Sequence, residues 1–545
     1  MHINPSTHQP LNLSTNFQMS KQEQFLEQMT NGYTFKGNSI ELGGAMLDGE
    51  CVPGATIRLP LKTLNRHGLI AGATGGGKTK TLQILAEHFA ENGIPSLLMD
   101  IKGDLSGIAA PGVSNAKIEE RHLKIGLPFA AAGNSVDFLT LSNEKGARLR
   151  ATVTEFGPVL FSRILGLNDT QSSIISVVFK YCDDNNLPLL DLQDIRKVLQ
   201  YLTNEGKAEI EAMYGRISTD SVGTMMRKIV ELEQQRADVF FGERSFEVQD
   251  LCRLDEKGRG MISIVRLTDI QDRPKLFSTF ILQMLAEIYS TFPEAGDVDQ
   301  PKLTIFIDEA HLVFDEASSA LLNQIEAIIR LIRSKGIGIF FVTQNPADIP
   351  DSVLGQLGLK VQHALRAFTA KDRKAIKLAA ENYPISEFYD VERVITEIGI
   401  GEALFTALNE KGSPTPLAHV MLRAPQSRMD VLTDAEIDTI VSRSALVRKY
   451  NEVVNRESAH EILTEKMQEA FDTEQQQELK NQQAKAEKAV PKRRVKAEKS
   501  TMEEIIDSPT TRQIGNTIAR ELTRGLLGVL GVGGTTRRRK KTSWF

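Results

Sequence analysis

Residues 66–89 read RHGLIAGATGGGKTKTLQILAEHF, and this stretch decides the fold. Its centre, GATGGGKT at 72–79, has the spacing of a P-loop, or Walker A motif. The apolar residues before the motif indicate the end of a buried strand. After it, Leu82, Leu85 and Phe89 recur at helical spacing. A flexible glycine turn is the simpler alternative, but the strand, loop and helix in sequence favour a nucleotide-binding loop.

The chemistry of the motif predicts its ligand. Glycines let the backbone curl with its N–H groups pointing inward, and the following helix presents its positive N-terminal end to phosphates. We expect Lys78 to reach the β- and γ-phosphates and the Thr79 hydroxyl to ligate Mg²⁺, so that ATP and Mg²⁺ are the predicted cofactors. The residues expected to bind the nucleotide are Gly72, Ala73, Thr74, Gly75, Gly76, Gly77, Lys78, Thr79 and Lys80.

A second motif lies at 301–314, PKLTIFIDEAHLVF, where an apolar run ends in two acids. At the carboxyl end of a strand, Asp308 would hold Mg²⁺ and Glu309 would polarise the attacking water as general base. An acidic pair could merely cap a strand, but its place downstream of a P-loop favours a Walker B motif. The letters from Asp308 to His311 also spell the box of another helicase superfamily, which would carry Ser-Ala-Thr after the next strand.

The next predicted strand, 337–343, is followed instead by Gln344. A glutamine there suits a sensor that touches the γ-phosphate or the water, although a polar residue at a strand end is the simpler alternative. We interpret His311 as structural.

Arginine is the usual source of positive charge for phosphoryl transfer. Arg330 and Arg333 lie three residues apart on one face of a helix predicted at about 316–335. Because they are a helix away from their own P-loop, we expect Arg333 to act on the nucleotide of a neighbouring subunit. Arg66, at the start of the P-loop strand, could approach the nucleotide of its own subunit. Exposed arginines are usually only solvated, and that alternative stays open for both.

Composition bounds the class of protein. The chain has 545 residues, 41% of them hydrophobic and 25% charged, as in ordinary soluble proteins, and its net charge of −5 excludes a uniformly basic DNA-coating protein. Its three cysteines match no zinc or disulfide spacing, which indicates a reducing cytoplasm. We expect neither a signal peptide nor a membrane-spanning helix.

Strands that alternate with helices, and that are apolar on both faces, predict an α/β fold with a parallel sheet covered on both sides. We divide the chain by pattern and composition. The expected parts are a flexible N-terminus (1–32), a short β element with the P-loop start of the core (33–104), a mostly helical insertion (105–295), the remainder of the core (296–425), a helical, charged linker (426–509), and an amphipathic helix with a basic tail (510–545).

Together these stretches resemble a known family. RHGLIAGATGGGKT, LLMDIKGD, IFIDEAHLVF, LIRSKGIGIFFVTQNP and QHALRAF are similar, in that order, to the HerA–FtsK branch of P-loop ATPases, and most similar to the bacterial HerA-like group called YjgR. The resemblance covers about residues 30 to 425. It implies an additional-strand, RecA-like three-layer core, a hexameric ring and ATP sites between subunits.

By position the resemblance carries over the catalytic set. It gives Lys78, Thr79, Asp308, Glu309 and Gln344 the family's catalytic positions, Arg333 that of the trans finger and Arg66 that of the cis arginine. Relatives in the family pump DNA beside a nuclease that docks on an N-terminal barrel. No such barrel is evident here, and the insertion is a second departure, so the sequence argues against a nuclease partner.

Two functions remain from the sequence. The first is an ATP-driven motor on double-stranded DNA, which pore loops or the basic tracts at 485–499 and 537–541 would contact. The second is a nucleotide-gated scaffold whose amphipathic helix at 510–532 docks a protein partner or a membrane surface. A solvated charge run and a packed helix are the simpler interpretations of these segments.

Overall fold

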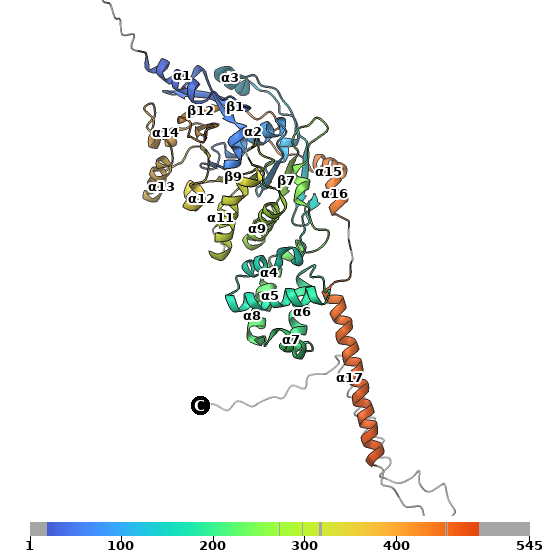
Figure 1. Ribbon diagram of the computed structural model, residues 1–545. Coiled ribbons are helices and arrows are strands. Elements are labelled where there is room, and N and C mark those ends of the chain that lie inside the picture. The colour runs from blue at the N-terminus through green and yellow to red at the C-terminus, as the bar shows by residue number, and fades with distance from the viewer. Residues whose placement is uncertain are drawn as a thin grey trace, which may run out of the picture. The chain divides into compact units, whose positions relative to one another are not determined.

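The computed structural model describes residues 19–489, except 272, 297, 315–318, 453 and 455. The chain divides into two units, residues 1–469 and 470–545. The first unit is built around a central sheet with helices packed against it (Figure 1). The twelve described strands of this sheet run in the order β2-β1-β12-β11-β10-β3-β9-β8-β4-β7-β5-β6. Of the second unit, residues 470–489 continue the last helix. The described strands are β1 Ser39–Leu47, β2 Glu50–Pro60, β3 Gly68–Ala71, β4 Ser96–Asp100, β5 Val136–Thr140, β6 Ala147–Arg148, β7 Ile262–Arg266, β8 Leu303–Ile307, β9 Ile337–Thr343, β10 Leu359–Gln362, β11 Glu402–Thr406 and β12 Ala418–Leu422.

The strands from β10 to β6 are parallel, and β11, β12, β1 and β2 extend the sheet in antiparallel fashion. In the parallel part, β9 lies between β3, which precedes the P-loop, and β8, which precedes the acidic pair. This inserted strand is the feature that the resemblance predicts for an additional-strand core, and it confirms the predicted α/β fold class.

Helices cover both faces of the sheet, and the strands bury side chains alternately toward each face. Ile70 and Phe306 point into the core beneath α2, whereas Leu69 and Ile305 point into the core beneath α9 and α11. On the α2 side, Phe89 packs against Phe306 with ring centroids 6.0 Å apart. The described helices are α1 Lys21–Gly32, α2 Lys78–Glu91, α3 Ala116–Ile125, α4 Val153–Ile164, α5 Asp169–Asp184, α6 Leu192–Thr203, α7 Lys207–Tyr214, α8 Thr219–Gln234, α9 Pro274–Thr291, α10 His311–Phe314, α11 Ser319–Ile332, α12 Asp351–Leu354, α13 Ala370–Glu381, α14 Val391–Glu397, α15 Asp434–Arg443, α16 Ala445–Tyr450 and α17 Ala459–Ala489. Short 3-10 turns lie at Leu61–Arg66, Ser106–Ala109, Ala237–Val239, Val248–Cys252, Arg333–Lys335 and Pro346–Asp348.

The N-terminal segment differs from the flexible stretch expected over 1–32. Residues 21–32 form α1, which begins at a capping box between Ser20 and Glu23. Its Phe25 is fully buried and meets the ring of Phe388 edge-on at 5.2 Å. The partner ring lies more than 300 residues away along the chain, so the local sequence could not reveal this contact.

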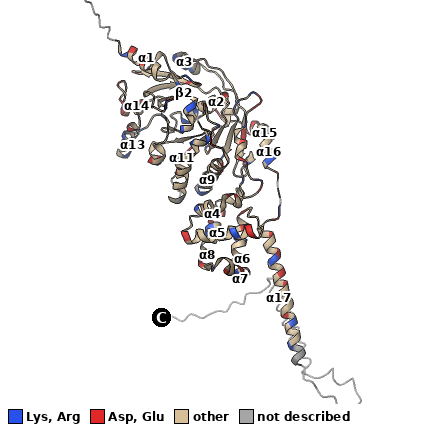
Figure 2. Ribbon diagram, in the orientation of Figure 1, with Lys and Arg blue, Asp and Glu red and all other residues tan. Residues whose placement is uncertain are grey.

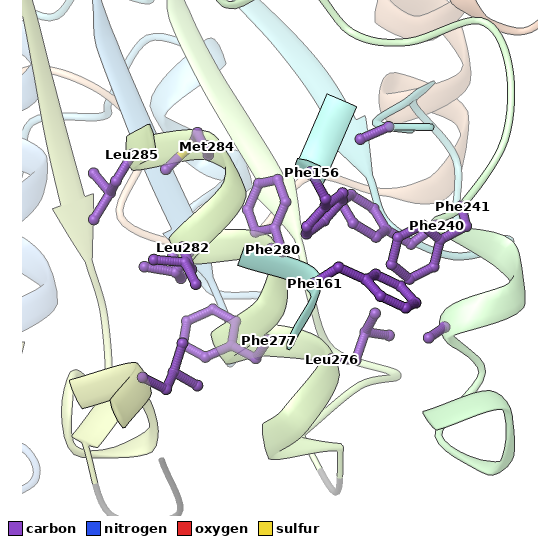
Figure 3. Packing of buried hydrophobic residues seen from close by; sticks show 14 of the residues in the cluster. Phe156, Phe161, Phe240, Phe241, Leu276, Phe277, Phe280, Leu282, Met284 and Leu285 are labelled. Atoms are coloured by element: carbon purple, nitrogen blue, oxygen red, sulfur yellow. The ribbon is translucent and has the colours of Figure 1, made fainter. Parts of the chain in front are cut away.

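The helical insertion is shorter than the expected 105–295. Strands β5 and β7, and helix α9, belong to the central sheet and its covering layer, which leaves α4 to α8 as the added helical part. An aromatic cluster joins this part to α9: Phe240 meets Phe156 at 6.1 Å and Phe280 of α9 at 6.0 Å (Figure 3). The added helices are therefore packed onto the core.

After β12 the chain passes along α2 before α15 begins. We call residues 423–432 the strap. Glu87 of α2 is buried and accepts hydrogen bonds from the backbone N–H groups of Gln426, at 2.7 Å, and Ser427, at 3.2 Å. Within the segment expected as a linker over 426–509, the described residues form α15, α16 and α17 with non-helical stretches before and between them, and the first of these stretches is bound to the core. The amphipathic helix and basic tail expected at 510–545 lie outside the described residues.

Over the described part of the chain, we find no helix with both the length and the apolar character needed to cross a membrane.

Candidate nucleotide site

The Walker A loop leaves the sheet at the carboxyl end of β3 and leads into α2, as the sequence predicts. Gly72, Gly75 and Gly77 have φ values of 150°, 79° and 119°, a region that side chains rarely adopt. Gly72 has a second constraint, because a Cβ atom there would lie 2.5 Å from the Cβ of His363. The loop therefore keeps its shape only with glycine at this position.

Neighbouring strands hold the loop in place. Ala73 donates its backbone N–H to the carbonyl of Ala364 at 2.8 Å, and Gly72 donates to that of Thr343 at 3.2 Å. His363 follows β10, and its Nδ1 lies 2.7 Å from the carbonyl of Glu402. Because a carbonyl only accepts, Nδ1 carries the proton, and the Thr81 hydroxyl donates to Nε2 at 2.8 Å. Burial lowers the pKa of His363 to about 4, so this brace is neutral at physiological pH.

The two polar residues of the motif point into the site. The Lys78 ammonium donates to the loop carbonyls of Gly72, at 2.7 Å, and Ala73, at 3.3 Å. Burial, and then the nearby Lys102 ammonium, lower the pKa of Lys78 below its usual range. The Thr79 hydroxyl donates to a carboxylate oxygen of Asp104 at 3.3 Å.

The acidic pair lies beside the loop after β4, which carries Asp104, because β8 and β4 are neighbours in the sheet. Asp308 is only 3% exposed, and one of its oxygens is buried without a hydrogen-bond partner among the described residues, as is one oxygen of Asp104. Burial raises the pKa of Asp308 to about 6, against the opposing charge of Lys102.

Asp104, which accepts from the Thr79 hydroxyl, and Asp308 each have an unpaired carboxylate oxygen, and oxygen ligands are those that Mg²⁺ prefers. Within the described ranges, no group of three or more His, Cys, Asp and Glu side chains could enclose a metal ion. Mg²⁺ is usually held by one or two carboxylates together with substrate phosphates and water. Thr79 and Asp308 therefore fit the predicted ion.

Glu309 has an unusual environment. It has a positive φ of 46°, uncommon for a residue with a side chain, and its side chain is 7% exposed. Its carboxylate forms an ion pair with Lys102 and lies 3.2 Å from His311 Nδ1. Burial works toward a higher pKa, but the bond to Lys102 outweighs it, and the pKa of Glu309 lies below its usual range.

Gln344 follows β9, which pairs with β3 on one side and β8 on the other. Its side chain is exposed at the same edge of the sheet as the P-loop and the acidic pair. The fold thus gathers Lys78, Thr79, Asp308, Glu309 and Gln344 at one edge.

The arginines lie elsewhere, and for Arg66 this corrects the expectation of a contact within its own subunit. Arg66 ends the 3-10 turn before β3, whereas the P-loop follows β3, so about 20 Å of extended chain separates them. At the amino ends of the strands, Arg66, Arg330 and Arg333 line a single groove together with Lys360. We call this the arginine groove.

Two residues of the site were not among the predicted set. Lys102 and Asp104 follow β4, and their loop is held by Asp100, which accepts from the backbone N–H groups of Gly103, at 2.8 Å, and Leu105, at 3.2 Å. Burial, and then the charge of Asp104, raise the pKa of Asp100 to about 7. The stretch LLMDIKGD carries the signal, but only the pairing of β4 with β8 shows that it faces the acidic pair.

A sheet in which β9 separates the Walker A strand from the Walker B strand, with both motifs at one edge, defines the additional-strand class of P-loop NTPase folds. The chain matches the model of the helicase HerA-like C-terminal family over residues 46–538, and it belongs to that family.

Among curated proteins, the chain is similar to the DNA double-strand break repair helicase HerA of Sulfolobus acidocaldarius, with 22% identity over 354 residues, which cover 64% of this chain and 63% of the relative. The protein of the same description from Sulfurisphaera tokodaii is 22% identical over 356 residues, with the same shares. The chain thus spans 63% of the length of these relatives.

Among solved structures, it is similar to the plasmid coupling protein TrwB in complex with an ATP analogue, at a TM-score of 0.47 and 14% identity over 73% of this chain and 99% of the other. It is also similar to VirB4 of Thermoanaerobacter pseudethanolicus, at a TM-score of 0.44 and 14% identity over 72% and 98% of the two chains.

Proposed function

We propose that this protein is a Mg²⁺-dependent ATPase that assembles into a ring, hexameric by analogy with its family, and acts as a motor on double-stranded DNA. The observation that carries the proposal is the meeting of the P-loop, the acidic pair and Gln344 at one edge of the sheet. Membership of the HerA-like family, and similarity to relatives described as DNA repair helicases, support DNA as the substrate. A nuclease partner is not part of the proposal.

Each residue of the site has a role in hydrolysis. The P-loop backbone and Lys78 hold the triphosphate, and Glu309 accepts the proton of the attacking water. Gln344 orients that water or the γ-phosphate. Thr79 and Asp308 would hold Mg²⁺, which neutralises charge on the β- and γ-phosphates when bound.

The arginine groove supports a site completed by a neighbour. Because Arg66, Arg330 and Arg333 lie at the opposite end of the strands from their own P-loop, they are available to the nucleotide of a second subunit. A guanidinium is always charged and stabilises the phosphoryl transition state without a proton. In a ring, each P-loop edge would face the arginine groove of the next subunit.

A basic helix face supports the contact with DNA. Figure 2 colours the lysines and arginines of the ribbon, α13 included. Lys371, Arg373, Lys374 and Lys377 are exposed on this helix, and none of the four forms an ion pair within the described part of the chain. Phe368, just before α13, is 88% exposed. Unpaired cations on one helix attract a phosphate backbone, whereas the net charge of −5 makes the rest of the surface unfavourable.

The test is the ATPase rate of the assembled protein with and without double-stranded DNA, at rising salt. We expect stimulation by DNA that declines with salt, and an affinity whose salt slope falls by about 0.9 for each lost phosphate contact. The variant Lys371→Gln/Lys374→Gln should reduce that slope, while the control Lys207→Gln/Lys257→Gln, two exposed lysines elsewhere, should not. Hydrolysis that ignores DNA, together with recovery of a protein or membrane partner, would favour the scaffold.

A further inference from the structure

We propose that Lys102 is the positioning residue that couples Glu309 to the third phosphate: it holds the Glu309 carboxylate until a γ-phosphate competes for its ammonium. The inference rests on the proposed ATPase function and deepens it. Its basis is the ion pair between Lys102 and Glu309 at the edge where the P-loop and Walker B meet.

The backbone beside Lys102 is fixed, so only its side chain can change partner. Asp100 binds the backbone N–H groups of Gly103, Asp104 and Leu105 within 3.2 Å. Gly103 has a φ of 77°, and a Cβ atom there would lie 2.8 Å from a Thr268 methyl carbon. A short turn held in this way aims the lysine at the site without leaving the loop free to swing.

The side chain itself has room to move. It is 36% exposed, whereas the Glu309 side chain it contacts is 7% exposed. A carboxylate that activates water would lie roughly 3 Å from that water, which lies about 3 to 3.5 Å from the phosphorus. The Glu309 carboxylate is then within about 7 Å of the reacting phosphorus, and an ammonium bound to that carboxylate is within about 10 Å. The flexible four-carbon lysine stem lets the ammonium move between the two.

The charges in the site determine whether the Lys102 ammonium pairs with Glu309 or with a phosphate. Lys102 shares the site with the Lys78 ammonium and with the carboxylates of Asp104, Asp308 and Glu309. A diphosphate held by the P-loop brings no oxygen beyond its β-phosphate, so Lys102 stays on Glu309. A triphosphate adds a group of higher charge density than a carboxylate, and the ammonium moves to it. Glu309 then has an oxygen free to accept the proton of water, and the γ-phosphate gains a cation.

The test is the ratio of affinities for the β,γ-imido analogue of ATP and for ADP, measured calorimetrically on the assembled protein with Mg²⁺. Lys102→Met keeps the length of the side chain and removes its charge. We expect the affinity for the triphosphate to fall about tenfold, the loss of one charged hydrogen bond, and that for ADP to stay unchanged. Lys102→Arg should restore part of the ratio. Lys102→Gln serves as a second neutral variant if the first fails to fold.

A double-mutant cycle separates this role from simple phosphate attraction. Glu309→Gln releases Lys102 from its partner, so it should raise the affinity for the triphosphate more than that for ADP. That gain should disappear in the Lys102→Met background. In steady state, Lys102→Met should raise KM for ATP, because the affinity for the triphosphate falls. It should also lower kcat, because the γ-phosphate no longer has the lysine cation beside it.

Lys449 supplies the control. Lys449 lies on α16, outside the site; its side chain is 32% exposed and forms an ion pair with Asp250 at 2.9 Å. Lys449→Met should therefore leave the affinity ratio and kcat unchanged. If the unmodified protein binds the analogue but the ratio is the same in Lys102→Met, the inference about Lys102 is wrong and the ATPase proposal stands. If the unmodified protein binds neither nucleotide, both fall.

Discussion

At the scale of single residues, Glu309 shows most directly how the site departs from ordinary structure. A residue with a side chain at a φ of 46° is uncommon and carries backbone strain, which persists where the surrounding structure holds it. Here Ala310 donates its backbone N–H to the carbonyl of Val342 at 2.9 Å, which ties the turn to β9. The turn places the Glu309 carboxylate against both Lys102 and His311, the first residue of α10.

A first prediction concerns the role of this carboxylate. Glu309→Gln keeps the shape of the side chain but cannot accept a proton, so it should bind ATP and lose roughly 10²-fold or more of its turnover. Nucleotide binding and phosphate release, measured on one preparation, check both parts. Turnover close to that of the unmodified protein would remove Glu309 from the role of general base.

A second prediction concerns Gly72. Gly72→Ala places a methyl group 2.5 Å from the Cβ of His363 at a φ of 150°, so we expect loss of nucleotide binding and of about 1 to 3 kcal/mol of stability. Gly75→Ala is the matched control, because Gly75 also has a positive φ but has nothing within 4 Å of the added atom. Equal effects of the two changes on ATP affinity would contradict the role given to His363.

At the scale of elements, β3 connects the P-loop to the arginine groove. The P-loop leaves its carboxyl end, and Arg66 and His67 precede its amino end. His67 is buried; its Nε2 lies 2.9 Å from the carbonyl of Ile329 in α11, and its Nδ1 accepts from the backbone N–H of Ile339 at 3.1 Å. This residue therefore holds the strand, the helix that carries Arg330, and β9 together.

A third prediction follows from the charge state of His67. Burial lowers its pKa to about 4, whereas an unfolded chain has a histidine pKa near 6.5. Below about pH 6.5 the histidine is protonated in the unfolded state but stays neutral in the folded state down to about pH 4. The free energy of unfolding should therefore fall between these pH values, by at most about 1.4 kcal/mol per pH unit for this group.

Urea unfolding between pH 7 and pH 4 measures this slope. His67→Gln should be less stable at pH 7 but should show a shallower decline with acid. An unchanged slope would mean that His67 is not the group responsible.

At the scale of the whole molecule, the proposed ring would divide each ATP site between two subunits. The P-loop edge carries the phosphate-binding and acidic residues, and the arginine groove lies at the opposite edge of the sheet. Within one subunit the arginines of the groove lie too far from the P-loop to contact a nucleotide bound there. This separation is the physical argument for the proposed ring.

A fourth prediction tests this division. Arg333→Ala and Arg66→Ala should each bind ATP and lose on the order of 10³-fold of turnover. Mixing either variant with Glu309→Gln subunits should restore part of the activity, because some interfaces then pair an intact carboxylate with an intact arginine. If Arg66 acted within its own subunit, its mixture would stay inactive, since each site would lack one group. Labelled subunits must show that the rings exchange.

Much of the fold and of the site was predictable from short stretches. The P-loop, the acidic pair and Gln344 each follow an apolar strand directly, and the strand predicted at 337–343 coincides with β9. The boundaries of the insertion were less predictable, because β7 has only five residues and its neighbours β4 and β5 are distant in the chain.

By itself, then, the amino-acid order determined the nucleotide-binding loop, the acids beside it and the α/β class, because that chemistry is carried by contiguous residues in a strand and its following turn. Only the tertiary structure decided that Lys102 faces Glu309, that His363 braces Gly72, and that Arg66 lies away from its own P-loop. Each of these depends on which strands become neighbours and on which end of a parallel strand a residue occupies, and strand pairing joins segments up to hundreds of residues apart, beyond the reach of any local pattern.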